Sequence, residues 1–172
     1  MKYTIRHAEL TDSKLLSEII RKSFIDVAQR FKLTSENCPT HPSNCQAEWV
    51  EKAIYKGVFY YLLEAEGQIC GCVALEKANE SVGYLERLSV MPEFRNRGLG
   101  IALVRHVFYE AKRLALNRVE IAIIAEQTDL EEWYQKRGFV FIRQASYDHL
   151  PFGVKFLGIE YQNVQFNVNP VY

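Results

Sequence analysis

The sequence has no long apolar run. Its longest apolar stretches, such as residues 58–63, fall well short of the roughly 18 residues that a membrane-spanning helix needs. The N-terminal stretch MKYTIRHAEL also lacks the apolar centre of a secretory signal peptide. We therefore expect no membrane attachment and a cytoplasmic protein, in which cysteine thiols stay reduced.

The sequence also lacks an excess of either charge. Lys plus Arg and Asp plus Glu number 21 each, so the formal net charge is zero. Without a basic surface field, we do not expect the protein to bind DNA or RNA. No internal repeat or low-complexity linker divides the 172 residues, which fits one domain. We place this domain at residues 1–166 and a C-terminal tail at residues 167–172.

The four cysteines are not spaced as in common metal or redox sites. Cys70 and Cys72 are separated by one residue in a predicted strand, which favours buried side chains over a Cys-x-x-Cys site. Cys38 and Cys45 enclose His41 in the stretch NCPTHPSNC, but three ligands without a fourth do not make a standard zinc site. A disulfide is disfavoured in the cytoplasm. We therefore expect no metal.

Hydrophobic periodicity predicts a mixed α/β (α+β) fold. Three consecutive strand patterns with short polar links indicate an antiparallel meander, and a strongly phased helix followed by a buried strand indicates one parallel β-α-β crossover. The predicted strands are residues 2–8, 58–65, 69–76, 82–90, 119–124, 139–143 and 154–161. A first helix is predicted after the N-cap cluster at residues 11–13, with apolar residues at helical spacing from Leu15 to Phe24 and a loop-rich stretch at residues 31–43. The other predicted helices are residues 46–55, 98–116 and 130–136.

A glycine-rich turn, VMPEFRNRGLG, precedes the strongest predicted helix. Gly98 and Gly100 let backbone N–H groups approach a ligand, and the free N–H groups and dipole of a helix start favour an anion. This predicts a cradle for a phosphate or pyrophosphate, with Arg95 and Arg97 adding charge at its rim. A Walker A loop is excluded because Ile101 follows the second glycine. The glycines alone would also fit a plain tight turn.

These residues resemble the GNAT superfamily of N-acetyltransferases. The stretch RNRGLG after the strand ending LSVMP looks like the family's acetyl-CoA motif. The later stretch LEEWYQKRGF is similar to a second family motif, a helix carrying Tyr134 followed by Gly-Phe. The resemblance covers nearly the whole chain. It implies a mostly antiparallel sheet with helices on both faces, and acetyl transfer from acetyl-CoA to an amine.

The resemblance also implies which residues contact the coenzyme. On the strand before the turn, the backbone of Leu88 and Val90 would pair with the pantetheine arm, and an N–H in this stretch would bind the oxyanion. The turn would hold the pyrophosphate. Gln127 stands where the family often has asparagine. The expected coenzyme contacts are Leu88, Ser89, Val90, Arg95, Asn96, Arg97, Gly98, Leu99, Gly100, Ile101, Gln127 and Tyr134.

Two residues are expected to take part in proton transfer. Tyr134 would protonate the departing thiolate, since a phenol with a pKa of about 10 stays protonated at neutral pH; a packed core tyrosine is the alternative. An alkyl amine is mostly protonated at pH 7, so a base or a water relay is needed. Glu86 is the expected base, because the two-residue strand period places it on the face of Leu88 and Val90. Glu126 or water are the alternatives.

The acceptor is expected to be a small-molecule or peptide amine. Pro39 and Pro42 stiffen the NCPTHPSNC loop, which falls where folds of this family build the acceptor side. We expect Asn37, His41 and Glu86 to contact the acceptor; an ordinary surface loop is the alternative. A coenzyme A-binding module without catalysis is the alternative function. We expect a monomer or a homodimer.

Overall fold

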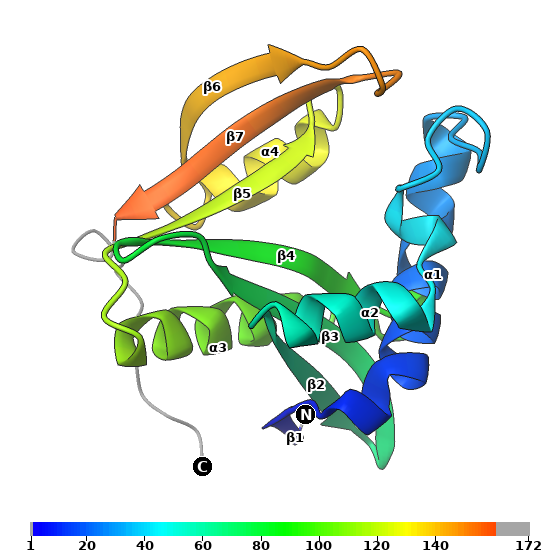
Figure 1. Cartoon of the computed structure of the whole chain (residues 1–172). Helices are drawn as coiled ribbons and strands as arrows, with labels where there is room; N and C mark the ends of the chain where they lie inside the picture. Colours follow the sequence, from blue (N-terminus) through cyan, green and yellow to red (C-terminus); the bar gives the residue numbers. More distant parts are fainter. Residues whose placement is uncertain (1, 161–172) are drawn as a thin grey trace.

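A computed structural model describes residues 2–160 and contains one seven-stranded sheet in the order β1-β2-β3-β4-β5-β7-β6 (Figure 1). All neighbouring strands are antiparallel except β4 and β5, which are parallel. The strands are β1 (Tyr3–His7), β2 (Phe59–Ala65), β3 (Gln68–Lys77), β4 (Val82–Val90), β5 (Arg118–Ile124), β6 (Val140–Ser146) and β7 (Gly153–Glu160). The helices are α1 (Ser13–Arg30), α2 (Ala47–Tyr55), α3 (Leu99–Arg113) and α4 (Thr128–Gln135), with 3-10 turns η1 (Leu10–Asp12), η2 (Pro42–Asn44) and η3 (Pro92–Phe94).

The predicted order of elements is confirmed, including the meander β2-β3-β4 and the crossover through α3. The first predicted helix is α1, which continues beyond Phe24 to Arg30 and ends where the predicted loop begins. Its last turns expose Ile25 but bury Ala28 against the segment that follows, so tertiary packing rather than a strong apolar stripe supports this end of the helix. Residue 161 of the last predicted strand, the expected domain end at residue 166 and the tail at residues 167–172 lie outside the described residues.

Helices pack on both faces of the sheet, as predicted. Along β2, Tyr61 and Leu63 pack into a core with α3, whereas Tyr60 and Leu62 pack with α1 and α2 on the other face. This alternation follows from the two-residue period of a strand. Fully burying one leucine contributes about 1.5–3 kcal/mol, so the two cores anchor the sheet from both sides. No helix within residues 2–160 has the length and apolar character needed to cross a membrane.

The sheet opens between its two parallel strands. β4 and β5 are paired only at their first residues and then diverge (Figure 1). Beyond Tyr84, the β5-facing edge of β4 therefore has no strand partner among residues 2–160. On its other edge β4 carries a bulge, since three steps from Glu86 to Ser89 match two steps from Cys72 to Ala74 on β3. Arg87 lies within the bulge and has a φ of 52°, which is uncommon for a residue other than glycine.

Candidate active site

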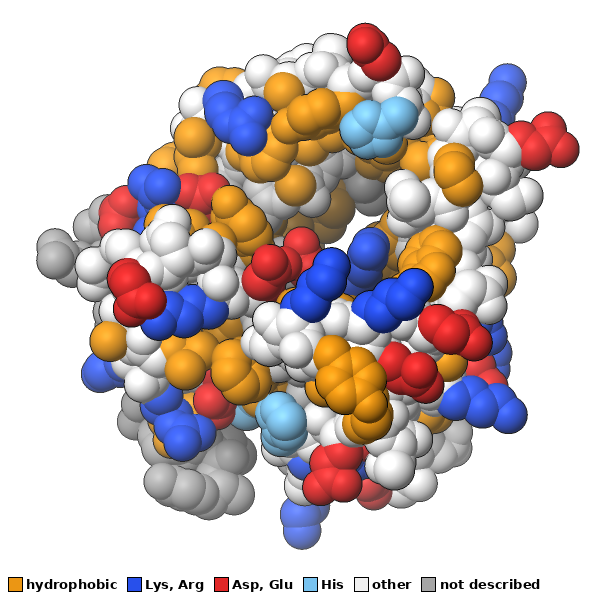
Figure 2. All heavy atoms as spheres, viewed as in Figure 1, with side chains coloured by type: hydrophobic (Ala, Val, Ile, Leu, Met, Phe, Trp, Pro, Cys, Tyr) orange, Lys and Arg blue, Asp and Glu red, His pale blue; other side chains and the backbone are white. Residues whose placement is uncertain are grey.

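The opening between β4 and β5 leads into a cleft of about 1110 Å3. Figure 2 shows a hollow near the centre of one face, with basic and acidic side chains around its rim. Two walls of the cleft differ in the elements that supply their lining residues. The α3–α4 wall is Leu88, Val90, Asn96, Gly98, Leu99, Gly100, Ile101, Trp133 and Tyr134, and the α1 wall is Ser23, Phe24, Asp26, Val27, Arg30, His41 and Pro42.

The glycine-rich turn forms the predicted helix start within the cleft. Gly98 is the N-cap of α3 and has a φ of 81°, a left-handed conformation that glycine adopts without steric cost. The first backbone bond of the helix runs from the N–H of Ala102 to the carbonyl of Gly98, at 3.1 Å. The N–H groups of residues 99–101 therefore have no acceptor within the helix, and they lie along the cleft. This geometry suits an anion.

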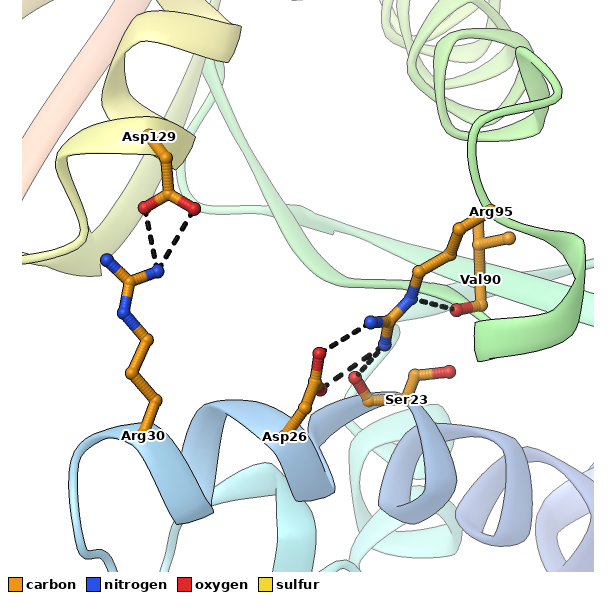
Figure 3. A network of polar contacts seen from close by, with 6 residues as sticks. All are labelled: Ser23, Asp26, Arg30, Val90, Arg95 and Asp129. Carbon is orange, nitrogen blue, oxygen red and sulfur yellow. Dashed lines mark hydrogen bonds and ion pairs between the residues drawn. The ribbon is translucent and has the colours of Figure 1, made fainter.

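Arg95 does not supply a free charge to this helix start. Its guanidinium donates to Asp26 Oδ2 at 2.5 Å and to the carbonyl of Ser23 at 2.8 Å, and its Nε donates to the carbonyl of Val90 at 3.1 Å (Figure 3). The expected role of Arg95 at the phosphate rim is therefore replaced by a structural one. Arg95 links the turn after β4 to α1. It also donates to the backbone carbonyl of Val90, a residue whose backbone was expected to pair with the coenzyme arm.

Two other expected coenzyme contacts also have different surroundings. Arg97 lies outside the cleft lining, where it pairs with Glu66 at 3.4 Å and lies over the ring of Phe94. Ser89 is buried and does not line the cleft; its hydroxyl donates to the carbonyl of Arg87 at 2.9 Å and supports the bulge. The remaining expected contacts, including Gln127 at the N-cap of α4, do line the cleft.

A second ion pair links α1 to the opposite side of the cleft. Arg30 contacts both carboxylate oxygens of Asp129 on α4, at 2.9 and 3.0 Å (Figure 3). We call Arg95–Asp26 and Arg30–Asp129 the α1 ties. Both start from cleft-lining residues of α1 that lie one helical turn apart, so one helix face holds both sides of the opening. Neither ion pair was predicted from the sequence, where the four-residue spacing of Asp26 and Arg30 was the only local sign that both face the same side of α1.

Tyr134 is both a packed residue and a residue of the cleft. Its ring makes edge contacts with Trp133 and Phe139, at centroid distances of 4.9 and 5.1 Å. Only 4% of the side chain is exposed, and burial raises the pKa of Tyr134 far above that of a free phenol. The hydroxyl therefore stays protonated at neutral pH. Trp133 in turn lies beside Gly100, where an added Cβ would be 3.6 Å from its ring.

The structure places Glu86 on a different face of β4 than predicted. Glu86 pairs with Ala74, whose side chain belongs to the core under α1 and α2, whereas Leu88 and Val90 pack toward the α3 core. The predicted shared face is wrong because the bulge at Arg87 interrupts the two-residue period. Glu86 nevertheless lines the cleft, and burial raises its carboxyl pKa.

His41 lies on the α1 wall as a buried, neutral imidazole. Only 5% of the residue is exposed, and its ring meets that of Phe24 edge-on at 5.9 Å. Burial, and secondly the charge of Arg87, lower the pKa of His41 to about 4. Nδ1 accepts the N–H of Ser43 at 3.2 Å, so the neutral ring carries its proton on Nε2.

The structure does not bring Asn37 to the cleft. Its Oδ1 accepts the N–H of Thr34 at 2.8 Å and its Nδ2 donates to the carbonyl of Lys32 at 2.9 Å, which closes the loop after α1. Arg21 on α1 holds the far end of the same loop through the carbonyl of Cys45, at 2.6 Å. The four cysteines are free thiols. Within residues 2–160, no group of three or more His, Cys, Asp or Glu side chains could hold a metal ion.

The sequence model of the acetyltransferase (GNAT) family matches residues 19–139, well over half of the chain. This chain belongs to the GNAT family of acetyltransferases. The amino-acid acetyltransferase of Neisseria meningitidis serogroup A is 32% identical to it over 93 residues, which cover 54% of this chain and 20% of that protein. The GNAT chain thus spans about a fifth of the length of this curated relative.

Solved structures share the GNAT fold at low sequence identity. The PaiA N-acetyltransferase of Thermoplasma acidophilum, in complex with coenzyme A, has a TM-score of 0.77 and is 16% identical, covering 94% of this chain and 100% of that chain. A GNAT family acetyltransferase from Elizabethkingia anophelis with acetyl-CoA bound has a TM-score of 0.67 and is 16% identical, covering 92% and 97%. The predicted family and fold are confirmed.

Proposed function

We propose that this chain transfers an acetyl group from acetyl-CoA to an amine by direct attack on the thioester. The observation that carries the proposal is the opening between β4 and β5, which ends at the free N–H groups of residues 99–101. A strand edge without a partner can pair with an extended pantetheine arm, and a helix start suits the pyrophosphate. Membership in the GNAT family and the coenzymes bound in the two solved structures support this donor.

The thioester carbonyl needs a hydrogen-bond donor as charge develops on its oxygen. We place it beside the bulge of β4, where regular pairing with β3 is interrupted next to Leu88. Such bulges redirect backbone groups, and one oxyanion donor in a preorganised site contributes about 2.7–4 kcal/mol to transition-state stabilisation. Of the two backbone contacts expected for the arm, Leu88 keeps this role, because the carbonyl of Val90 is bonded to Arg95.

Two proton transfers complete the reaction. The neutral amine attacks the carbonyl carbon, the C–S bond breaks, and the hydroxyl of Tyr134 donates its proton to the thiolate. Burial raises the pKa of Tyr134, so this group is still protonated when the thiolate leaves. Glu86 accepts the proton that the amine nitrogen loses as the new C–N bond forms. Its pairing with Ala74, which packs in the core under α1 and α2, supports a base on the acceptor side.

The acceptor is an amine of a small molecule or a peptide. The name of the Neisseria relative favours amino acids within this class. We do not propose Asn37 as an acceptor contact, because its side-chain oxygen and nitrogen both form hydrogen bonds within the loop. His41 remains a proposed contact, because it lines the cleft as a neutral ring with its proton on Nε2.

Calorimetry and thiol release test the proposal together. We expect acetyl-CoA to bind with a dissociation constant below 1 mM, and free coenzyme A to form only when an amine is added. No binding at millimolar acetyl-CoA would reject the donor. Binding without thiol release across a broad amine panel would instead favour a coenzyme-binding module.

Substitution of Glu86 tests the base separately. In the wild type, kcat/KM should rise with pH as the raised pKa of Glu86 is passed. In Glu86→Gln this limb should disappear and the rate should fall. If the limb is unchanged in the variant, water or another carboxylate is the base.

A further inference from the structure

The cleft contains one arginine whose guanidinium has no ion-pair or hydrogen-bond partner among residues 2–160. Five arginines line the cleft. Two of them form the α1 ties, and two lie over the rings of Trp133 and Phe156 at 3.5 and 3.7 Å. The fifth is Arg87, and its guanidinium is alone among them in forming no hydrogen bond, ion pair or ring contact with residues 2–160. A half-buried guanidinium without a partner has its five N–H donors available to a ligand.

The backbone conformation of Arg87 also points to a function. Its φ of 52° is one that residues other than glycine rarely adopt, and such residues concentrate at functional sites. The surroundings hold it there: Glu86 and Ser89 pair with β3 on either side, and the hydroxyl of Ser89 bonds the carbonyl of Arg87 at 2.9 Å. The bulge therefore directs an unpaired cation into the cleft at a defined place.

The groups that feel the charge of Arg87 lie on the acceptor side. They are the imidazole of His41, the thiols of Cys45 and Cys72, the phenol of Tyr60 and the carboxyl of Glu86. The first four are neutral at pH 7, and Glu86 does not approach within ion-pair distance of Arg87 in the described structure. Three of them, Cys45, Cys72 and Tyr60, belong to the core under α1 and α2. Glu86 pairs with Ala74 of the same core, and His41 meets Phe24, which packs against it. Among the described residues, no carboxylate therefore forms an ion pair with Arg87 on the side where the amine would enter.

We propose that Arg87 binds a carboxylate of the acceptor, so that the acceptor is a free amino acid rather than a peptide N-terminus. This inference rests on the proposed function. A guanidinium matches a carboxylate with two parallel hydrogen bonds. A free α-amino acid carries its amine and its carboxylate on one carbon, and the consecutive residues Glu86 and Arg87 face the same cleft. A peptide N-terminus has an uncharged amide in place of this carboxylate.

The test compares pairs of acceptors that differ only in this charge. Thiol release from acetyl-CoA is measured with a set of L-amino acids and with the α-carboxamide of each, and kcat/KM of acid over amide is the readout. This ratio cancels any general loss of activity in a variant. For the best acceptor, the wild type should prefer the acid by about tenfold or more, and Arg87→Gln should lower the ratio by about as much. Arg87→Lys, which keeps the charge but not the fork, should fall between them.

Arg143→Gln is the matched control, because it removes another cleft arginine that lies over Phe156. It should keep the wild-type ratio. Amides or dipeptides used as well as acids by the wild type, or an equal ratio in wild type and Arg87→Gln, would overturn the inference and leave acetyl transfer standing. Failure of every amine, acid and amide alike, would overturn the proposed function and this inference with it. If circular dichroism shows that Arg87→Gln is unfolded, the lowered ratio must be seen in Arg87→Lys.

Discussion

The α3–α4 wall and the α1 wall enclose the same cleft but are built by different means. The first is built mainly on residues 88–101, to which Trp133 and Tyr134 are added; in this stretch Gly98 turns the backbone and the helix start presents its own N–H groups. The second depends on side chains that reach across the sequence, as when Arg95 bonds Asp26. Backbone geometry thus defines one wall, and long-range side-chain contacts define the other. The substitutions that follow test whether changes in the two walls have separate effects on turnover, acetyl-CoA affinity and the free energy of unfolding.

The largest effect is expected on the α3–α4 wall, at Tyr134. Tyr134→Phe removes the proposed acid and keeps the ring contacts with Trp133 and Phe139. General acid catalysis typically contributes 10²–10⁴-fold, so kcat should fall by about that factor while the dissociation constant of acetyl-CoA stays close to the wild-type value. Steady-state kinetics and calorimetry measure the two quantities.

Tyr147→Phe serves as the control for this substitution. Tyr147 also lines the cleft, but it lies in the connection between β6 and β7, away from α4. Removing the hydroxyl of Tyr147 should change kcat much less than removing the hydroxyl of Tyr134. Wild-type turnover in Tyr134→Phe would contradict the assignment of the leaving-group acid.

The contrast between the walls also explains what the sequence could predict. β4 was predicted with its observed bounds, and the helix start at Gly98 was expected, because strand periodicity and glycine turns are local signals. The pairing of Arg95 could not be predicted, because its partner Asp26 is 69 residues away in the sequence and no local pattern reveals it. The bulge at Arg87 could not be predicted either, because the residues around it show no interruption of the strand-like sequence.

On the α1 wall, the expected effect is a change in pH dependence. Burial lowers the pKa of His41 to about 4, from an ordinary value of 6.5. Between these values the unfolded chain binds a proton that the native chain does not, so stability falls as the pH drops from about 6.5 to 4. The pKa difference corresponds to about 3 kcal/mol once the pH is below both values.

His41→Asn isolates this contribution. Asparagine keeps a side-chain acceptor for the N–H of Ser43 but does not titrate. Urea unfolding at pH 7, 6, 5 and 4 should therefore show a smaller loss of stability in the variant than in the wild type. Parallel pH profiles for the two proteins would mean that His41 is not the titrating group.

The two α1 ties should differ in strength although both are Arg–Asp pairs. Arg95→Gln leaves Asp26 unpaired and removes donors from two backbone carbonyls, which should lower the free energy of unfolding by about 1–3 kcal/mol. Arg30→Gln should change it by about 0.5 kcal/mol or less, because the side chains of Arg30 and Asp129 are 47% and 65% exposed. Urea unfolding measures both. Equal losses would show that the extra backbone bonds of Arg95 contribute nothing.

A pair of glycine substitutions separates backbone strain from ligand binding on the α3–α4 wall. Gly98 and Gly57 both have positive φ, 81° and 90°, and at both an added Cβ meets open space. Gly98→Ala and Gly57→Ala should each lower the free energy of unfolding by about 1 kcal/mol, since alanine is strained in this conformation. Only Gly98 caps the helix start in the cleft, so only Gly98→Ala should also weaken acetyl-CoA binding in calorimetry. Unchanged affinity in Gly98→Ala, or an equal loss in Gly57→Ala, would place the pyrophosphate elsewhere.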